Sequence, residues 1–138
     1  MISLIGKNLT AGYGGVDIIN DINLIVKEGE IVVIVGPNGA GKSTAMKSLL
    51  GMLGLTEGSV FFSDTDITKM LPQDRVKLGI AFVPQNQNVF TGMTVEENLE
   101  MGGFLRQDNI IETIDEIYQL FPVLKEKRNQ NTGELSGG

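Results

Sequence analysis

The sequence predicts an α/β fold in which a buried strand leads directly into a glycine-rich loop and then into a helix. The strand signal is the uninterrupted β-branched run Ile31–Val35, which is typical of a strand buried on both faces of a parallel sheet. The stretch Gly36–Gly41 follows at once. A helical pattern then begins, with apolar positions at Met46, Leu49, Leu50 and Leu53. These observations predict a helix over 43–53, joined by the loop to the strand.

The rest of the first ninety or so residues adds shorter elements. Residues 1–28 are expected to be β structure, because Ile22, Leu24 and Val26 alternate imperfectly with their neighbours before a turn at 27–30. A further turn at 57–58 precedes a predicted strand over 59–62. A short helix is expected over 72–78, with its proline in the first turn. A strand is expected over 80–83, ending at Pro84.

The remainder of the chain has a helical pattern. Thr94 with Glu97 three residues later forms a capping box that predicts a helix to about Met101. A second helix, stopped by Pro122, is predicted from an apolar face at Ile110, Ile111, Ile114, Ile117, Tyr118 and Phe121. We interpret these apolar positions as core packing.

Composition excludes several kinds of function. With 138 residues the chain has the length of one domain, and 41% apolar residues suffice for a core. The net charge of −6 disfavours nucleic-acid binding, which depends on clustered Lys and Arg. The absence of Cys and His excludes disulfides, thiolate metal sites and histidine bases. The N-terminus lacks a signal-peptide pattern and no apolar run is long enough to span a bilayer, so we expect no membrane insertion.

The loop Gly36–Ser43 matches the phosphate-binding pattern G-x-x-x-x-G-K-[ST]. Glycines let the backbone bend around phosphates, and the helix that follows presents its N-terminal dipole to an anion. The expected phosphate donors are the amides of Gly39, Gly41, Lys42, Ser43 and Thr44. Lys42 is expected to neutralise the β and γ phosphates, and the Ser43 hydroxyl to bind Mg²⁺. The alternative is a glycine-rich turn that binds nothing, but it leaves both the lysine and the serine unexplained.

Three separated motifs together resemble a known family. They are Gly36-Pro-Asn-Gly-Ala-Gly-Lys-Ser-Thr44, Val83-Pro-Gln85 and Leu135-Ser-Gly-Gly138. In this order they resemble the ATPase subunits of ATP-binding-cassette (ABC) transporters, over the whole chain from Leu4. The resemblance implies the P-loop NTPase fold of an ABC ATPase, with an N-terminal antiparallel β region, a parallel core and a helical subdomain. It also implies that the C-terminal half of the cassette is not in this sequence.

The resemblance assigns a role to individual residues. ATP and Mg²⁺ are the implied cofactors, with Gly36 and Asn38 among the residues that contact the nucleotide. Tyr13 matches the aromatic residue that stacks on adenine, although alone it is an ordinary turn tyrosine. Gln85 matches a catalytic glutamine that contacts Mg²⁺ or the attacking water, and Lys42 is the other catalytic residue. Alone, Gln85 is a polar loop residue.

The C-terminal motif carries a role between subunits. Ser136, Gly137 and Gly138 match the family's signature, which contacts the γ-phosphate bound by the second subunit of a head-to-tail dimer. Alone, this sequence is more typical of a plain turn. The resemblance divides the chain into a nucleotide-binding core over residues 1–89 and a helical subdomain over 90–138, which docks onto transmembrane permease subunits. The expected location is therefore peripheral, on the cytoplasmic face of the cell membrane.

The implied function is to couple ATP binding and hydrolysis to solute import. The stretches 85–98 and 120–129 resemble the subunit that powers branched-chain amino-acid uptake, so these are the expected solutes. One alternative is a non-transport ABC ATPase of DNA repair or translation, which the charge and the lack of basic clusters disfavour. Another is a nucleotide-binding fragment without activity.

Several groups of the family pattern do not occur in this sequence. They are the acidic strand end that supplies an Asp and the catalytic Glu, the switch His, and several core strands. Phosphoryl transfer requires a positioned water and neutralised charge, so we expect the chain by itself not to hydrolyse ATP. We also expect its exposed apolar surface to drive association.

Overall fold

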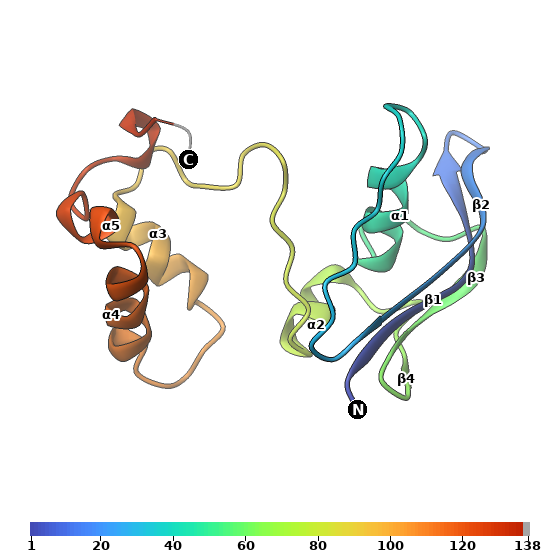
Figure 1. Ribbon diagram of the computed structural model, residues 1–138, viewed down its shortest axis with the longest axis horizontal. Coiled ribbons are helices and arrows are strands. Elements are labelled where there is room, and N and C mark those ends of the chain that lie inside the picture. Colours follow the sequence, from blue (N-terminus) through green and yellow to red (C-terminus); the bar gives the residue numbers. More distant parts are fainter. Residues whose placement is uncertain (137–138) are drawn as a thin grey trace. The chain divides into compact units, whose positions relative to one another are not determined.

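The computed structural model describes residues 1–136 and consists of two compact units, Met1–Phe82 and Val83–Gly138 (Figure 1). The family resemblance implies a boundary after residue 89. In the structure the second compact unit begins at Val83, and it therefore includes residues 83–89. Residues 137 and 138 of the signature lie outside the described part of the chain. Within that part, no helix combines the length and the apolar character needed to cross a membrane.

An antiparallel sheet of order β2-β1-β3-β4 forms one layer of the first unit. Its strands are β1 (Ser3–Tyr13), β2 (Val16–Lys27), β3 (Glu57–Phe62) and β4 (Thr65–Asp66). The hairpin between β1 and β2 turns at Gly14 and Gly15, which both have positive φ angles as a tight turn requires. This sheet confirms the predicted N-terminal antiparallel region and the strand at 59–62.

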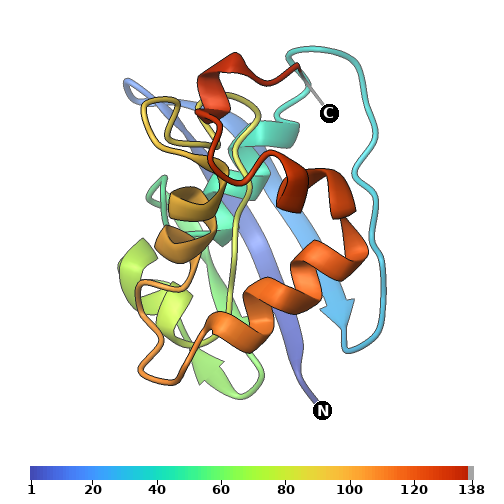
Figure 2. The same cartoon turned by 90° about the vertical axis from the view of Figure 1, so that its left-hand side faces the viewer.

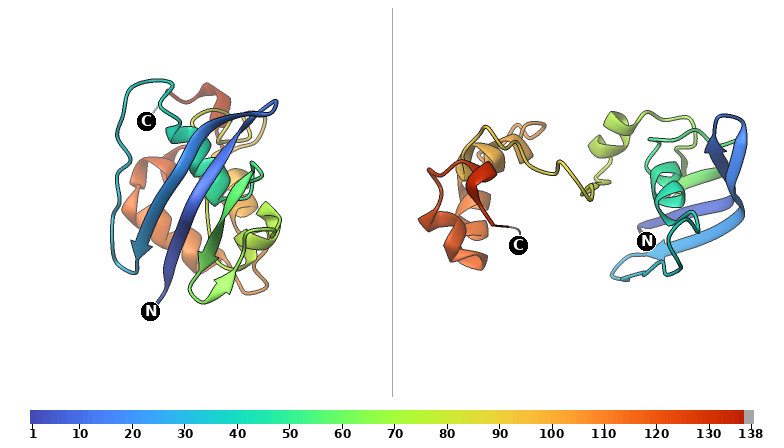
Figure 3. Two further views of the ribbon diagram at one scale, coloured as in Figure 1. Left: turned by 90° about the vertical axis from the view of Figure 1, so that its right-hand side faces the viewer. Right: turned by 90° about the horizontal axis from the view of Figure 1, so that it is seen from above.

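Helix α1 (Lys42–Leu49) packs against one face of this sheet, as Figure 3 shows from two sides. Ala45 and Leu49 of the helix are buried with Leu9, Ile19 and Val60 of the strands, in the core of the unit. The helix was predicted over 43–53 but ends earlier. Gly51 follows with a φ of 74°, a left-handed conformation that terminates the helix.

The short helix α2 (Pro72–Lys77) was predicted, but its most important residue was not. Arg75 is 2% exposed, the largest side chain among the fully buried ones. Its guanidinium donates to the carbonyl oxygens of Leu49 at 2.6 Å, Thr68 at 3.0 Å and Met70 at 3.0 Å. Burial lowers the pKa of Arg75. These bonds attach α2 to the C-terminal end of α1 and to the segment that precedes α2.

Two predicted strands are wrong. Residues 31–35 and 80–83 are extended but belong to no strand, and the segment 31–35 runs unpaired between β2 and α1. Ile31 and Val35 are 93% and 83% exposed. A strand is defined by the hydrogen bonds it shares with a neighbour, and no partner strand for either segment lies in residues 1–136. No parallel pairing is present in this range either.

The second unit is helical, and Figure 2 shows its helices in orange to red. Helix α3 (Val95–Gly102) begins at Thr94 with the predicted capping box, in which Glu97 N donates to Thr94 Oγ1 at 3.2 Å. Helix α4 (Ile111–Leu120) also follows the prediction. Helix α4 ends before Pro122, as predicted. Pro122 is also the first residue of a further helix, α5 (Pro122–Glu126), which was not predicted. A single 3₁₀ turn, η1 (Thr132–Glu134), precedes the signature sequence.

A buried contact joins the first two of these helices. The hydroxyl of Tyr118 in α4 donates to Glu96 Oε2 of α3 at 2.9 Å, and the tyrosine is 6% exposed. Burial, followed by this bond to a carboxylate, raises the pKa of Tyr118 to about 12. The predicted apolar face of α4 is therefore only partly core, since Ile111 is 63% and Phe121 is 56% exposed.

Candidate phosphate-binding site

The loop Gly36–Gly41 forms a concave backbone turn at the N-terminus of α1. Gly39 and Gly41 adopt φ angles of 82° and 93°, a left-handed conformation that side chains disfavour. Gly41 is also limited by space, because an added Cβ would lie 2.6 Å from Ile19 Cγ2 of β2. Any larger residue at this position would therefore push the loop away from the sheet that supports it.

The Lys42 side chain folds back across this loop. Its Nζ donates to Gly36 O at 2.6 Å and to Pro37 O at 2.7 Å. The two carbonyls therefore hold a positive charge inside the turn, although Lys42 lies at the first position of α1. An anion entering the loop meets this ammonium group together with the positive end of the helix dipole.

The amides at the start of α1 complete the anion site. The N–H groups of Lys42, Ser43 and Thr44 belong to the first turn of a helix, where no preceding helical carbonyl is available to accept them. Ser43 is exposed, so its hydroxyl is accessible to a metal ion held by phosphate oxygens. Thr44 is different, because the residue is buried, at 6% exposed.

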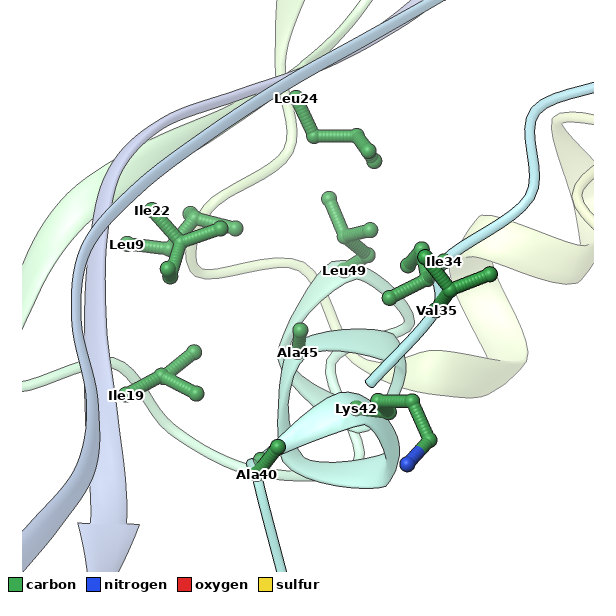
Figure 4. Close-up of a pocket in the computed structure, with 11 residues that line it drawn as sticks. Leu9, Ile19, Ile22, Leu24, Ile34, Val35, Ala40, Lys42, Ala45 and Leu49 are labelled. Atoms are coloured by element: carbon green, nitrogen blue, oxygen red, sulfur yellow. The ribbon is translucent and has the colours of Figure 1, made fainter. Parts of the chain in front are cut away.

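The elements behind the loop fix its position. Figure 4 shows Leu9, Ile19 and Ile22 of the sheet facing Ala45 and Leu49 of α1. Between them lies an apolar cavity of about 200 Å³, which Ile34 and Val35 also line. The helix is thus incompletely packed where the cavity separates it from β1, β2 and residues 34–35.

The remaining predicted site residues are placed as follows. Asn38 is exposed in the loop, and Tyr13 is 49% exposed at the end of β1, with its ring accessible for stacking. Both belong to the first unit with the loop. Gln85 and Ser136 are exposed in the second unit, and nothing in the structure relates them to the loop. Among residues 1–136, no group of three acidic, His or Cys side chains could hold a metal ion by itself.

Sequence reasoning missed Arg75, which supports the site from the far end of α1. Two of its acceptors, Thr68 O and Met70 O, are near in the chain, but Leu49 O lies 26 residues away, so no local pattern predicts the burial of this side chain. Gly51 could have given a signal, because a Cβ there would lie 2.8 Å from the Arg75 guanidinium. A glycine just after a predicted helix is, however, already explained as a helix terminator.

Comparisons with known proteins identify relatives of this chain. A family model described as ABC transporter matches residues 19–138. The chain is 40% identical over 131 residues to a probable branched-chain amino acid transport ATP-binding protein LivF of Archaeoglobus fulgidus, covering 94% of this chain and 56% of that protein. It is 39% identical to the high-affinity branched-chain amino acid transport protein BraG of Pseudomonas aeruginosa, covering 91% and 54%.

A transport protein of another kind and a solved structure are also similar. The lipopolysaccharide export ATP-binding protein LptB of Escherichia coli is 31% identical, over 100% of this chain and 58% of that protein. A crystal structure of a nucleotide-free ATP-binding cassette from an ABC transporter superimposes with a TM-score of 0.82 at 29% identity, covering 99% and 60%. The chain therefore spans a little over half the length of the curated relatives it matches.

Proposed function

This chain belongs to the ABC transporter family, and on that premise we propose that it binds Mg-ATP through Gly36–Thr44. The observation that carries the proposal is the Lys42 ammonium held inside the loop, 2.6 Å from Gly36 O, at the start of α1. A nucleotide triphosphate is the ligand that suits this arrangement, because its charge can be shared among the lysine, the helix amides and a metal ion. In this proposal Ser43 and Gln85 hold Mg²⁺ and Tyr13 stacks on the base.

A calorimetric titration of Mg-ATP into the chain tests this proposal. Lys42→Ala removes a charge-assisted hydrogen bond to phosphate, so we expect affinity to fall about ten- to a hundredfold, the effect of ~1.5–3 kcal/mol. Lys47→Ala is the matched control, because Lys47 lies on the same helix but in its last turn. Equal losses in the two variants, or no binding by the unchanged chain, would contradict the proposal.

For the whole protein that contains this chain, we propose an ATPase that drives solute transport across a membrane. It would act as a head-to-tail dimer with permease subunits, at the cytoplasmic face of the membrane. The similarity to two branched-chain amino-acid transport proteins supports import of such solutes. ATP-dependent leucine uptake by the whole protein, reconstituted with its permease, would support this, and ATP turnover without uptake would argue against import.

Export is the second candidate, because a lipopolysaccharide export protein is also similar, over the whole chain but at lower identity. The same reconstituted vesicles distinguish import from export, because ATP-dependent accumulation of leucine is expected from an importer and not from an exporter. A non-transport role has no specific observation in its favour.

A further inference from the structure

In the second unit, two segments far apart in sequence are joined by backbone hydrogen bonds. Thr132 N donates to Met93 O at 3.0 Å, and Gly133 N donates to Thr91 O at 3.2 Å. The approach is close, since a Cβ on Gly133 would lie 3.0 Å from Thr91 O. Residues 91–94 and 131–133 therefore lie side by side, although they are separated by three helices.

Asn98 of α3 strengthens this junction with its side-chain amide. Its Oδ1 accepts from Phe90 N at 2.7 Å, while its Nδ2 donates to Phe90 O at 3.0 Å and to Thr94 O at 2.9 Å. The amide thus pairs with both backbone groups of Phe90, as the backbone of a neighbouring strand would. This pairing fixes a residue that lies outside any strand or helix.

Thr132 completes the arrangement from the other segment. Its Oγ1 donates to the same Phe90 O at 2.8 Å and lies 3.3 Å from Asn98 Nδ2. The Phe90 carbonyl therefore accepts from three donors: Met93 N at 3.0 Å, Asn98 Nδ2 and, from the other segment, Thr132 Oγ1. We call Phe90, Asn98 and Thr132 the Asn98 clamp.

We infer that the Asn98 clamp holds residues 90–94 and 131–133 at a fixed distance from each other, with Asn98 as a positioning residue for the backbone that follows Gln85 and the backbone that precedes Ser136. Phe90 follows Gln85 closely in the chain, and Thr132 shortly precedes Ser136. The inference rests on the proposed function, because only that function gives Gln85 and Ser136 contacts with nucleotide.

A purely local role for Asn98 would involve only the turn before its own helix. Four of its bonds do join α3 to residues 90–94. The contact with Thr132 spans 34 residues, however, and Thr132 Oγ1 itself bonds to Phe90 O across a separation of 42. The measurement that distinguishes the two roles is therefore the distance between residues 91–94 and 131–133, and not the stability of α3.

Distance measurements between the two segments test the inference. The chain contains no cysteine, so Asn88→Cys and Glu134→Cys, both at exposed positions, place spin labels specifically on either side of the clamp. We expect one narrow distance distribution by pulsed electron resonance. Asn98→Asp keeps the size and the acceptor for Phe90 N but turns a second oxygen toward Phe90 O and Thr94 O, so the distribution should broaden.

The control variant is Asn109→Asp, which makes the same change of charge in the same unit. The Asn109 Oδ1 only accepts a bond, from Ile111 N at 3.1 Å, and a carboxylate does the same, so the distribution should stay narrow. An unchanged distribution in Asn98→Asp, or equal broadening in both variants, would overturn the inference.

A second pair of variants covers the case in which Asn98→Asp also loses helical circular dichroism. Thr132→Val removes the hydroxyl but keeps the shape, and Thr132→Ser keeps the hydroxyl. We expect broadening only with valine, and no difference between the two variants would overturn the inference. Titration of Mg-ATP into the unchanged chain reports separately on the proposed function, so absent binding beside an intact clamp would remove that function alone.

Discussion

Two neighbouring stretches of the first unit are both rich in Ile and Val, but only one of them forms a strand. In β2, Ile19 is 4% exposed and the strand pairs along its length with β1. In the segment 31–35, which begins a few residues later, Val33 is 73% exposed and no strand pairs with it within the described range. The second stretch has the stronger β-branched signal and yet forms no strand.

The difference shows that a strand depends on its partner more than on its own residues. β-branched side chains favour an extended backbone, and residues 31–35 are extended. The stabilisation of a sheet comes from cross-strand pairs and from burial, which a partner must supply. β1 and β2 meet through a two-residue turn, whereas a buried parallel strand needs neighbours from elsewhere in the sequence.

The largest expected effect is the difference between a charge placed in the paired sheet and a charge placed in the unpaired segment 31–35. Val60→Asp in β3 puts a carboxylate at a side chain that is 0% exposed, so we expect a loss of about 4 kcal/mol or more in unfolding free energy. Val33→Asp is the matched change in the unpaired segment, where we expect a change within about 0.5 kcal/mol. Urea unfolding of both variants measures the difference.

Equal destabilisation by Val33→Asp and Val60→Asp would contradict the proposed difference in burial between the two positions. That result would mean that residues 31–35 are buried in solution, for example by association of chains. A sedimentation measurement on the unchanged chain would then show concentration-dependent oligomers, which Val33→Asp should dissociate.

We expect an intermediate loss of stability when the buried Arg75 guanidinium, which donates to three backbone carbonyls, is removed. Arg75→Met keeps an apolar stem but leaves the carbonyls of Leu49, Thr68 and Met70 without this donor. We expect a loss of about 3 kcal/mol in unfolding free energy. Lys77→Met, which removes only an exposed ion pair to Asp74, should cost about 0.5 kcal/mol or less. Similar unfolding midpoints for the two variants would show that the buried guanidinium does not stabilise α1.

The smallest effect is a pH dependence in the second unit. The pKa of Tyr118 is raised to about 12 from an ordinary value of 10.0, so the unfolded chain loses this proton first. The stability that Tyr118 contributes is therefore complete below pH 10.0 and is lost as the pH rises toward about 12. Urea midpoints across this range should fall more steeply for the unchanged chain than for Tyr118→Phe. Parallel curves would mean that Tyr118 is accessible to solvent in the folded state.

Most helices could be predicted because their signals are local. Thr94 and Glu97 form the capping box within one turn, and the apolar spacing of α4 is complete within ten residues. The end of α1 was less well predicted, because the apolar pattern continues to Leu53 while the chain already turns at Gly51. Arg75 could not be predicted as a buried residue, because one of its acceptors, Leu49 O, is 26 residues away and is brought to it only by the fold.

The conformation of the glycine-rich loop follows from the local sequence, since Gly39, Gly41 and Lys42 occur within one short motif whose backbone requirements are local, and its binding of phosphate stays a prediction. Only the tertiary structure decided which extended segments became strands and which side chains were buried. The physical reason is that hydrogen bonds between strands and the removal of apolar surface from water both require a partner, and a partner is a property of the fold rather than of the segment.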